Sequence, residues 1–352
     1  MKTYLVTGGA GFIGSNYVLY LLERYPQVKV INVDVLTYAG NLENLKSIEG
    51  DPRHFFVQAD ICDRAAVQKL FQDHDVDYLV NFAAESHVDR SILDPQVFVQ
   101  TNVSGTLNLL QCAKEAWQIG EDEYKPGVKF LQVSTDEVYG SLGAEGFFTE
   151  QTPLDPHSPY SASKASADLL TKAFYDTYRL PINITRCSNN YGPFQFPEKL
   201  IPLMLNNALQ HRELPVYGDG LQIRDWLYVE DHCQAVELVL RDGAVGEAYN
   251  IGGHNERTNL EIVGQIIAYL RQEADSAVGE HLIRHVIDRK GHDRRYGIDP
   301  TKISEALGWS PQTAFEQGIR KTIKWYLDNH DWVEHVTSGS YRDYYQRLYE
   351  GR

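Results

Sequence analysis

Short apolar runs alternate with amphipathic stretches along the first half of the chain. The apolar runs predict buried strands at residues 4–6, 28–33, 55–58, 78–83, 129–134 and 182–186. Between them, apolar residues recur at helical spacing and predict helices at residues 12–24, 65–73, 95–117 and 160–178. This alternation favours an α/β fold, in which a doubly wound parallel sheet carries helices on both faces.

The second half of the chain has a less regular pattern. Residues 193–202 are rich in proline and aromatic residues, and we expect them to form a loop that leaves the first domain. Short strands and helices beyond it predict a smaller lobe, some segments of which return to the main sheet. We therefore expect a first domain at 1–190 and a smaller, partly discontinuous C-terminal substrate-binding lobe at 191–352. Ligands of such folds bind at the carboxyl ends of the strands, where the strand order reverses.

Composition narrows the classes of partner. The chain has 352 residues, of which 43% are hydrophobic and 23% charged, as in an ordinary globular protein. A formal net charge of −15 argues against nucleic acid as a partner, because binding it requires many cations opposite the phosphates. Any anionic ligand would have to be held by local donors.

Cysteine usage and apolar run lengths bear on the compartment. Cys62, Cys112, Cys187 and Cys233 lie far apart in the sequence and form no CxxC pair. We therefore expect neither a disulfide framework nor a metal site. Residues 3–7 have the pattern of a strand rather than of a signal peptide, and no apolar run is long enough to span a membrane. These features predict a cytoplasmic protein that does not enter a membrane.

The segment between the first strand and the first helix is rich in glycine. Gly8, Gly11 and Gly14 follow the spacing GxxGxxG, which permits a tight turn and leaves helix amides free for a pyrophosphate. Asp34 ends the second strand, where a carboxylate receives the ribose hydroxyls of NAD and repels the extra phosphate of NADP. A glycine-rich turn alone is a weak signal, and Asp34 alone could be an exposed strand-end residue. In this context they predict an NAD-binding Rossmann domain.

Tyr160 and Lys164 stand four residues apart at the start of an expected helix and therefore share one face of it. A phenol is a poor base at neutral pH, because its pKa is ~10. A lysine ammonium nearby and the positive nicotinamide of NAD⁺ would lower that pKa. The phenolate could then take a hydroxyl proton while a hydride passes to the cofactor. Such pairs also occur by chance, but this one follows a strand that ends in Ser134 and Thr135.

Eight segments of the chain together resemble one family. They are TGGAGFIGSN, LTYAGN, AAESHVDRS, STDEVYG, PYSASKASAD, CSNNYGP, RDWLYVEDH and KGHDRRYGID, which extend to residue 299 and so span most of the chain. Any one of them could belong to a relative, but the set is specific. The chain resembles the extended short-chain dehydrogenase/reductases and, among these, is similar to the dTDP-glucose 4,6-dehydratases. The resemblance implies a bound NAD in the domain at 1–190.

Thr135, Asp136 and Glu137 carry a further implication. Hydride transfer needs no additional carboxyl groups, whereas an elimination needs one base and one acid. The resemblance assigns Glu137 as the base that removes the proton at sugar carbon 5, and Asp136 as the acid that protonates the departing 6-hydroxyl. Asp136 then needs a raised pKa, from burial or from the neighbouring carboxylate. Taken alone, the two carboxyl groups could be a solvated loop pair, and Thr135 only a helix cap or turn residue.

The resemblance also assigns residues to both ligands. Cofactor contacts are expected from Gly8, Gly11, Phe12, Ile13, Gly14, Asp34, Val35, Leu36, Thr37, Asp60, Ile61, Phe82, Ala83, Ala84, Ser86, Thr101, Tyr160, Lys164 and Asn190. Substrate contacts are expected from Ser86, His87, Thr135, Asn189, Lys199, Leu200, Pro215, Tyr217, Arg224, Asn259, Arg289, His292 and Tyr296.

Some of these assignments leave alternatives open. Asp60 could meet the adenine or cap the following helix. Val35 stands where the family commonly carries a basic residue, which puts one contact near the adenosine in doubt. Tyr217 could stack on the base or belong to the core. Arg224 and Lys199 are expected at the diphosphate, since an arginine fork matches phosphate oxygens.

The implied reaction converts dTDP-glucose to dTDP-4-keto-6-deoxyglucose and water by internal hydride transfer through bound NAD. A 4-epimerase or decarboxylase would share the first oxidation, but epimerases of this type lack the acid–base pair. A non-catalytic NAD-binding protein would usually lack the tyrosine or the lysine. UDP-glucose stays an alternative substrate. Relatives pair the helices near 98–117 and 160–178, which implies a homodimer, although both helices could instead pack only on their own sheet.

Overall fold

A parallel sheet of seven strands forms the centre of the protein, which a computed structural model describes at residues 1–338. The strand order is β12-β8-β7-β4-β1-β2-β3, and every pairing is parallel. The strands are β1 (Lys2–Thr7), β2 (Val28–Asp34), β3 (His54–Gln58), β4 (Tyr78–Asn81), β7 (Lys129–Thr135), β8 (Ile182–Cys187) and β12 (Ala248–Ile251). The expected α/β fold with a doubly wound parallel sheet is confirmed.

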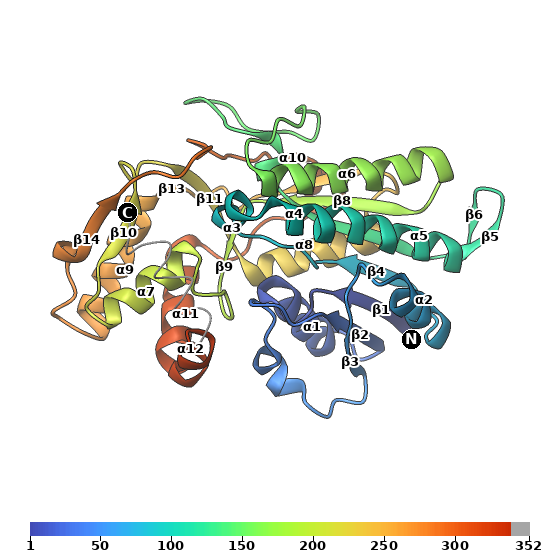
Figure 1. The fold of residues 1–352 in the computed structure, drawn as a ribbon, viewed down its shortest axis with the longest axis horizontal. Helices are drawn as coiled ribbons and strands as arrows, with labels where there is room; N and C mark the ends of the chain where they lie inside the picture. Colours follow the sequence, from blue (N-terminus) through green and yellow to red (C-terminus); the bar gives the residue numbers. More distant parts are fainter. Residues whose placement is uncertain (339–352) are drawn as a thin grey trace.

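Helices cover both faces of this sheet (Figure 1). One face packs on α1 (Phe12–Arg24) and α8 (Val229–Asp242), and the other on α2 (Arg64–Asp73), α5 (Thr106–Trp117) and α6 (Pro159–Tyr178). Side chains alternate along each strand, so Tyr4 and Val6 of β1 join one apolar cluster and Leu5 joins the other. Burial on both faces explains the nearly continuous apolar runs in the sequence.

The helix expected at 95–117 has three parts. It begins as α4 (Pro95–Phe98), continues through a π-helical stretch (Val99–Gly105) and ends as α5. Shorter elements before and after it are α3 (Val88–Leu93), β5 (Gln118–Gly120), β6 (Glu123–Tyr124) and 3₁₀ helices at Leu42–Ile48 and Asp136–Tyr139. π-helical turns are rare in proteins, and those that do occur are often found at functional sites.

A smaller lobe with its own apolar core follows the first body (Figure 1). Its elements are β9 (Asn189–Tyr191), α7 (Leu200–Leu209), β10 (Leu214–Tyr217), β11 (Ile223–Tyr228), β13 (Glu256–Thr258), α9 (Asn259–Glu273), a 3₁₀ helix (Glu280–Leu282), β14 (Ile283–Val286), α11 (Phe315–Asp328) and α12 (His330–Val336). Strand β12 lies at the edge of the large sheet, and α10 (Thr301–Leu307) contacts it. The division at residue 190 stays a prediction.

The loop expected at 193–202 is shorter than predicted. Helix α7 begins at Leu200, so Pro202 belongs to its first turn. Proline is tolerated there because the first amides of a helix have no partner within the helix. Proline content therefore marked the start of a helix as well as the loop before it.

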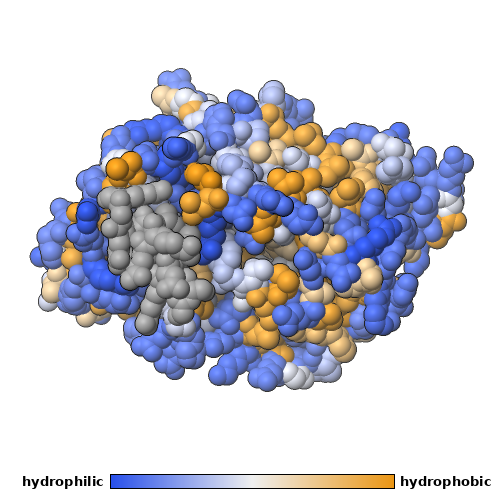
Figure 2. Space-filling model, viewed as in Figure 1, coloured by the Kyte–Doolittle hydropathy of each residue, from blue (hydrophilic) through white to orange (hydrophobic). Residues whose placement is uncertain are grey.

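Apolar side chains gather on one visible face, over α4, α5 and α6 (Figure 2). The exposed large apolar residues of these helices and their neighbours include Leu93 of α3, Val97 of α4, Val99 of the π-helical stretch and Leu169 of α6, which is 61% exposed. Within residues 1–338, no helix has the length and apolar character needed to cross a bilayer. The four cysteines are free. Residues 1–338 contain no cluster of three or more potential metal ligands.

Candidate active site

The glycine-rich turn after β1 lies against the loop after β4. A Cβ atom on Gly8, whose φ is +69°, would lie 2.6 Å from the amide nitrogen of Ala83, and one on Gly14 would lie 2.1 Å from the Gly8 carbonyl oxygen. Gly11 caps α1 without a side-chain hydrogen bond, so the first amides of this helix are available to an anion. The turn has the form that a dinucleotide pyrophosphate requires.

Asp34 joins this turn to the loop after β2. Its Oδ2 accepts a hydrogen bond of 3.0 Å from the Ala10 amide, and its Oδ1 accepts one of 2.8 Å from the Leu36 amide. Leu36 has a φ of 58°, which is rare for a residue with a side chain and typical of functional loops. Burial raises the pKa of Asp34, and these amide bonds lower it. Asp34 is therefore buried, not an exposed strand-end residue, and free lone pairs remain for ribose hydroxyls.

The other cofactor candidates follow the strand ends in the same way. Val35 and Thr37 follow β2; Asp60 and Ile61 follow β3; Phe82, Ala83, Ala84 and Ser86 follow β4. The suggestion that Asp60 caps the next helix is wrong. Asp63 caps α2 through the Ala66 amide, because it directly precedes the helix, whereas Asp60 accepts from the Cys62 amide. The adenine contact of Asp60 stays a prediction.

Asn102, in the π-helical stretch, has a structural role that the sequence analysis missed. Its amide group bonds both the backbone nitrogen and the backbone oxygen of Glu85, at 2.9 Å each, and donates to Ser163 Oγ at 2.8 Å. It therefore connects the loop after β4 to α6, one residue before Lys164. The neighbouring candidate Thr101 is half-buried on the same stretch.

The two carboxyl groups lie in a 3₁₀ turn at the end of β7. Thr135 Oγ1 accepts a hydrogen bond of 3.3 Å from the Glu137 amide, so Thr135 does cap this turn. Asp136 is 1% exposed, which excludes a solvated loop pair. Burial above all, and then the charges of Glu137 and Asp225, raise the pKa of Asp136 well above its usual value. The expected raised pKa is confirmed.

Glu137 has a different electrostatic surrounding. Burial raises the pKa of Glu137, but Arg289, Arg224 and Lys199 lower it. Those cations favour the carboxylate of Glu137, whereas at Asp136 the charges of Glu137 and Asp225 outweigh that of Arg224 and favour the protonated form. The pair therefore has the asymmetry of one base and one acid.

Helix α6 brings the tyrosine and the lysine next to this pair. The helix starts with a capping box between Ser158 and Ser161 and with proline at its first position. Tyr160 and Lys164 are both buried, and Nζ of Lys164 donates a hydrogen bond of 2.7 Å to the Val133 carbonyl of β7.

The protein groups alone do not lower the pKa of Tyr160, and the joint effect of Lys164 and NAD⁺ on it stays a prediction. Burial, followed by the charge of Glu137, raises the pKa of Tyr160 well above its usual value, and a hydrogen bond with Thr135 lowers it. The reason is that Tyr160 is buried beside carboxyl groups, and Lys164 is itself buried, which lowers its own pKa. Thr135 thus contacts both Tyr160 and the acid–base turn.

The three cations that lower the pKa of Glu137 come from separate segments. Arg224 donates to the carbonyls of Ile223 at 2.7 Å and Asp293 at 3.0 Å, and within residues 1–338 it forms no ion pair of its own. Lys199 donates to the Ser86 carbonyl at 2.7 Å. Burial lowers the pKa of Arg224 and of Lys199. Cations buried mainly against carbonyls are costly, and an anionic ligand would offset that cost.

Arg289 and its neighbours complete the polar lining. Nη1 of Arg289 lies 3.8 Å from Oδ2 of Asp89, and the buried Nε of Arg289 has no hydrogen-bond partner among the described residues. His87 precedes α3 and is buried, which together with Lys199 lowers its pKa well below the usual value.

The remaining candidates His292, Tyr217 and Asn190 contact residues outside the acid–base turn. His292 Nδ1 lies 2.5 Å from Asp288 Oδ1, and burial lowers its pKa to about 4. The rings of Tyr217 and His292 meet edge to face with their centres 6.1 Å apart. Asn190 uses its amide on Ser188 and His232. Asn189 lies in β9, Leu200 begins α7, Pro215 lies in β10 and Asn259 begins α9, and their ligand contacts stay predictions.

Asp225 and Asp293 were missed although both lie in the motifs RDWLYVEDH and KGHDRRYGID. Asp225 accepts hydrogen bonds from the amides of Gly253 and Asn255, and its charge raises the pKa of Asp136. The sequence shows that both residues are aspartates, but the residues that they contact, such as Gly253 for Asp225 and His157 for Asp293, are distant in the sequence. Only the motifs could have drawn attention to them.

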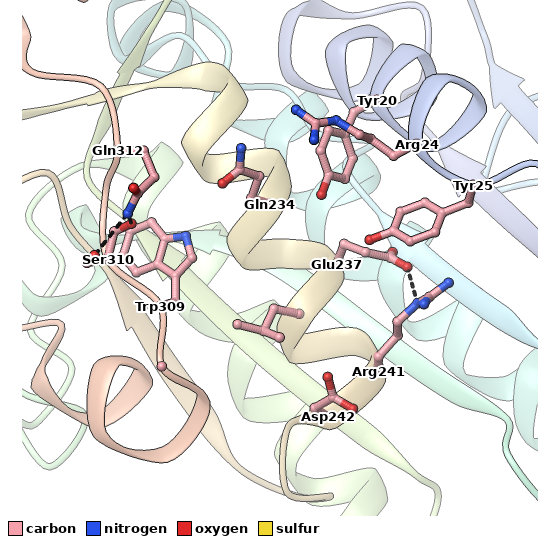
Figure 3. Close-up of a pocket in the computed structure, with 12 residues that line it drawn as sticks. Tyr20, Arg24, Tyr25, Gln234, Glu237, Arg241, Asp242, Trp309, Ser310 and Gln312 are labelled. Carbon is pink, nitrogen blue, oxygen red and sulfur yellow. Dashed lines mark hydrogen bonds and ion pairs between the residues drawn. The ribbon is translucent and has the colours of Figure 1, made fainter.

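A cavity of about 460 Å³ lies elsewhere, between α1, α8 and residues 308–312 (Figure 3). It contains none of the predicted site residues. The buried Glu237 at its wall accepts hydrogen bonds from the hydroxyls of Tyr4 and Tyr17 and from Arg241. This network fastens α8 to β1 and α1.

The Rossmann sheet, the glycine turn and the Tyr160–Lys164 pair define an NAD-binding short-chain dehydrogenase/reductase. The sequence profile of the family described as GDP-mannose 4,6 dehydratase matches residues 5–322. The chain therefore belongs to that family and, within it, to the dTDP-glucose 4,6-dehydratases.

Individual relatives agree with this placement. The chain is 56% identical over 345 residues to the dTDP-glucose 4,6-dehydratase of Xanthomonas campestris pv. campestris (strain B100), covering 97% of this chain and 98% of the relative. It matches the crystal structure of the Bacillus anthracis enzyme of that name in complex with NAD at a TM-score of 0.86 and 50% identity, over 96% and 100% of the chains. The Streptomyces venezuelae enzyme, with NAD and TYD bound, matches at 0.87 and 48% identity, over 95% and 99%.

Proposed function

We propose that this protein converts dTDP-glucose to dTDP-4-keto-6-deoxyglucose and water, with NAD retained through each turnover. The observation that carries the proposal is the meeting of Asp136 and Glu137, a buried carboxyl pair of unequal surroundings, with Tyr160. A simple dehydrogenase has no use for two additional carboxyl groups, whereas an elimination needs both.

Each residue has a separate task. Tyr160 takes the proton of the sugar 4-hydroxyl, and Thr135 holds the phenol and the sugar oxygen. Loss of the carbon 4 hydride leaves a 4-keto group that acidifies the hydrogen at carbon 5, which Glu137 removes while Asp136 protonates the departing 6-hydroxyl. Carbon 5 is reprotonated when the hydride returns to carbon 6. Bound NAD supplies the hydride acceptor for carbon 4 and the donor for carbon 6, and its positive ring favours the phenolate. The glycine turn, the free amides of α1 and Asp34 fit such a cofactor.

The diphosphate of the substrate is held by local cations. Arg224, Lys199 and Arg289 come from three segments and converge near Glu137 although the chain carries a net charge of −15. Arginine offers a planar fork to phosphate oxygens. The thymidine base is proposed because curated relatives that are 50–56% identical over nearly the whole chain are named for dTDP-glucose.

The direct test is incubation of the purified protein with dTDP-glucose or UDP-glucose, without added NAD, followed by mass measurement. Loss of one water from dTDP-glucose is the expected result, and Tyr160→Phe is the inactive control. A product of unchanged mass with inverted carbon 4 would indicate an epimerase and overturn the proposal. Equal turnover of UDP-glucose would overturn only the choice of base.

We also propose that the protein is a homodimer and is located in the cytoplasm. A second copy of the chain covers the exposed apolar residues Leu93, Val97, Val99 and Leu169, giving a homodimer through α4–α6 in the cytoplasm. Light scattering after size-exclusion chromatography should give twice the chain mass. Leu169→Glu should shift it to the monomer, while Leu221→Glu, at an exposed site of the smaller lobe, should not.

A further inference from the structure

Asp293 joins three parts of the site through one residue. Its Oδ1 lies 2.6 Å from Nδ1 of His157, and its Oδ2 accepts a hydrogen bond of 2.5 Å from the Tyr296 hydroxyl. Its backbone carbonyl accepts a hydrogen bond of 3.0 Å from Nη2 of Arg224. Asp293, Tyr296 and Arg224 are all buried, so water does not compete for the bonds among these three residues.

Arg224 and Tyr296 form one rigid unit at the inner end of this chain of contacts. The guanidinium lies 4.1 Å from the centre of the Tyr296 ring. Both side chains interact with the charge of the acid–base turn, since Glu137 raises the pKa of Tyr296 and Arg224 lowers the pKa of Glu137. The position of this unit therefore affects both the anion site and the general base.

His157 forms the outer end and belongs to the other body of the protein. It directly precedes Ser158, the residue that caps α6. Nε2 of His157 lies 3.7 Å from Oδ2 of Asp155, and its hydrogen bond with Asp293 raises its pKa. A Cβ atom on Gly291, whose φ is +62°, would lie 3.0 Å from the His157 carbonyl oxygen, so the two segments pack closely.

We propose that Asp293 is a positioning residue for binding of the nucleotide diphosphate, and that His157 fastens it to the start of α6. The contact sets Arg224 and Tyr296 in register with Tyr160, which lies in the first turn of that helix. A carboxylate suits this position because it accepts from the imidazole with one oxygen and from the phenol with the other. The inference rests on the proposed function, in which Arg224 helps to hold the substrate diphosphate.

The test compares His157→Ala, His157→Asn and Asp293→Asn in the full-length, NAD-loaded protein. Asparagine keeps an N–H near the position of Nδ1, whereas alanine removes it. Asp293→Asn replaces one carboxylate oxygen with an NH₂ group, which cannot accept a hydrogen bond from the His157 imidazole or the Tyr296 hydroxyl, whichever it faces. The control is His335→Ala, which removes another histidine whose Nδ1 contacts a carboxylate, at 2.8 Å from Glu43. Calorimetry gives the dissociation constant for thymidine diphosphate, and steady-state kinetics give KM and kcat for dTDP-glucose.

His157→Ala should raise the dissociation constant and KM about fivefold to tenfold, with kcat within about twofold of wild type. His157→Asn should restore most of that loss, and Asp293→Asn should weaken binding about tenfold or more. Unchanged binding in His157→Ala, or the same loss in the asparagine variant, overturns the inference. His157 is 43% exposed at its side chain, so these two variants should fold even if Asp293→Asn does not.

Failure of the inference differs from failure of the proposed function. A wild-type protein that dehydrates dTDP-glucose, with variants that bind like it, overturns only the positioning role. A wild-type protein that binds thymidine diphosphate and responds to the variants as expected, but releases no water, overturns only the reaction.

Discussion

Nζ of Lys164 donates a hydrogen bond of 2.7 Å to the carbonyl oxygen of Val133. This bond connects α6 to β7, the strand that ends at Thr135 and leads into the acid–base turn. It holds Tyr160 at a fixed place relative to Asp136 and Glu137. The lysine therefore both orients the catalytic elements and places a cation one helical turn from the phenol.

Lys164→Met should slow the first hydride transfer by about 10²-fold or more, because the phenolate loses its neighbouring cation and the helix loses its tie to β7. The measurement is the single-turnover rate of NAD reduction. Lys172→Met is the control, since Lys172 lies on the exposed side of the same helix, paired with Asp176. A wild-type rate in Lys164→Met would contradict the assignment.

Glu137→Gln and Asp136→Asn should separate oxidation from elimination. Both variants keep the Tyr160–Lys164 pair, so bound NAD should still be reduced, while formation of the 4-keto-6-deoxy product falls by about 10²- to 10⁴-fold. Rapid quenching and mass measurement would show 4-keto sugar that has lost no water. Product release at the wild-type rate would exclude both residues from the elimination.

The raised pKa of Asp136 makes the stability of the fold depend on pH. Burial and the charge of Glu137 make the folded protein bind this proton more tightly than the unfolded chain does. Stability therefore falls as pH rises above the usual carboxyl pKa of about 4, until the folded-state pKa is passed. Asp136→Asn removes this loss, so its Tm should exceed that of wild type at neutral pH.

Thermal unfolding at several pH values checks this expectation. The difference in Tm between Asp136→Asn and wild type should grow as pH rises from about 4. Asp122→Asn serves as control, because Asp122 is exposed and its positive φ of 53° suits asparagine. A difference in Tm that stays constant with pH would show that Asp136 does not titrate as proposed.

Gly14→Ala should weaken NAD retention and lower stability by about 1–3 kcal/mol, because the new Cβ would lie 2.1 Å from the backbone oxygen of Gly8. The NAD content of the purified protein and its Tm measure the two effects. Gly143→Ala is the matched control, since a Cβ there meets nothing within 4 Å. Normal NAD content in Gly14→Ala would show that the turn does not bind the pyrophosphate.

Local pattern was sufficient for much of the fold. The alternation of apolar runs with helical spacing predicted the strands and helices of the sheet, since period and burial are properties of short segments. The loop predicted at 193–202 from its proline content extended too far, because proline occurs both in loops and in the first turn of helices. The π-helical stretch at Val99–Gly105 was not predicted either. The residues that form a π-helical turn are much the same as those that form an α-helix, so the apolar pattern does not distinguish the two.

The sequence by itself determined the chemical groups: the glycine turn, Asp34, the Asp136–Glu137 pair and the Tyr160–Lys164 pair, which are all short-range spacings. Only the tertiary structure decided how the groups affect one another. It buried Tyr160 beside carboxyl groups, so that its pKa rises where the spacing to Lys164 suggested a fall. It brought Asp293 to His157 across 136 positions of the chain. Burial and through-space charge depend on which distant segments meet, and no local pattern contains that information.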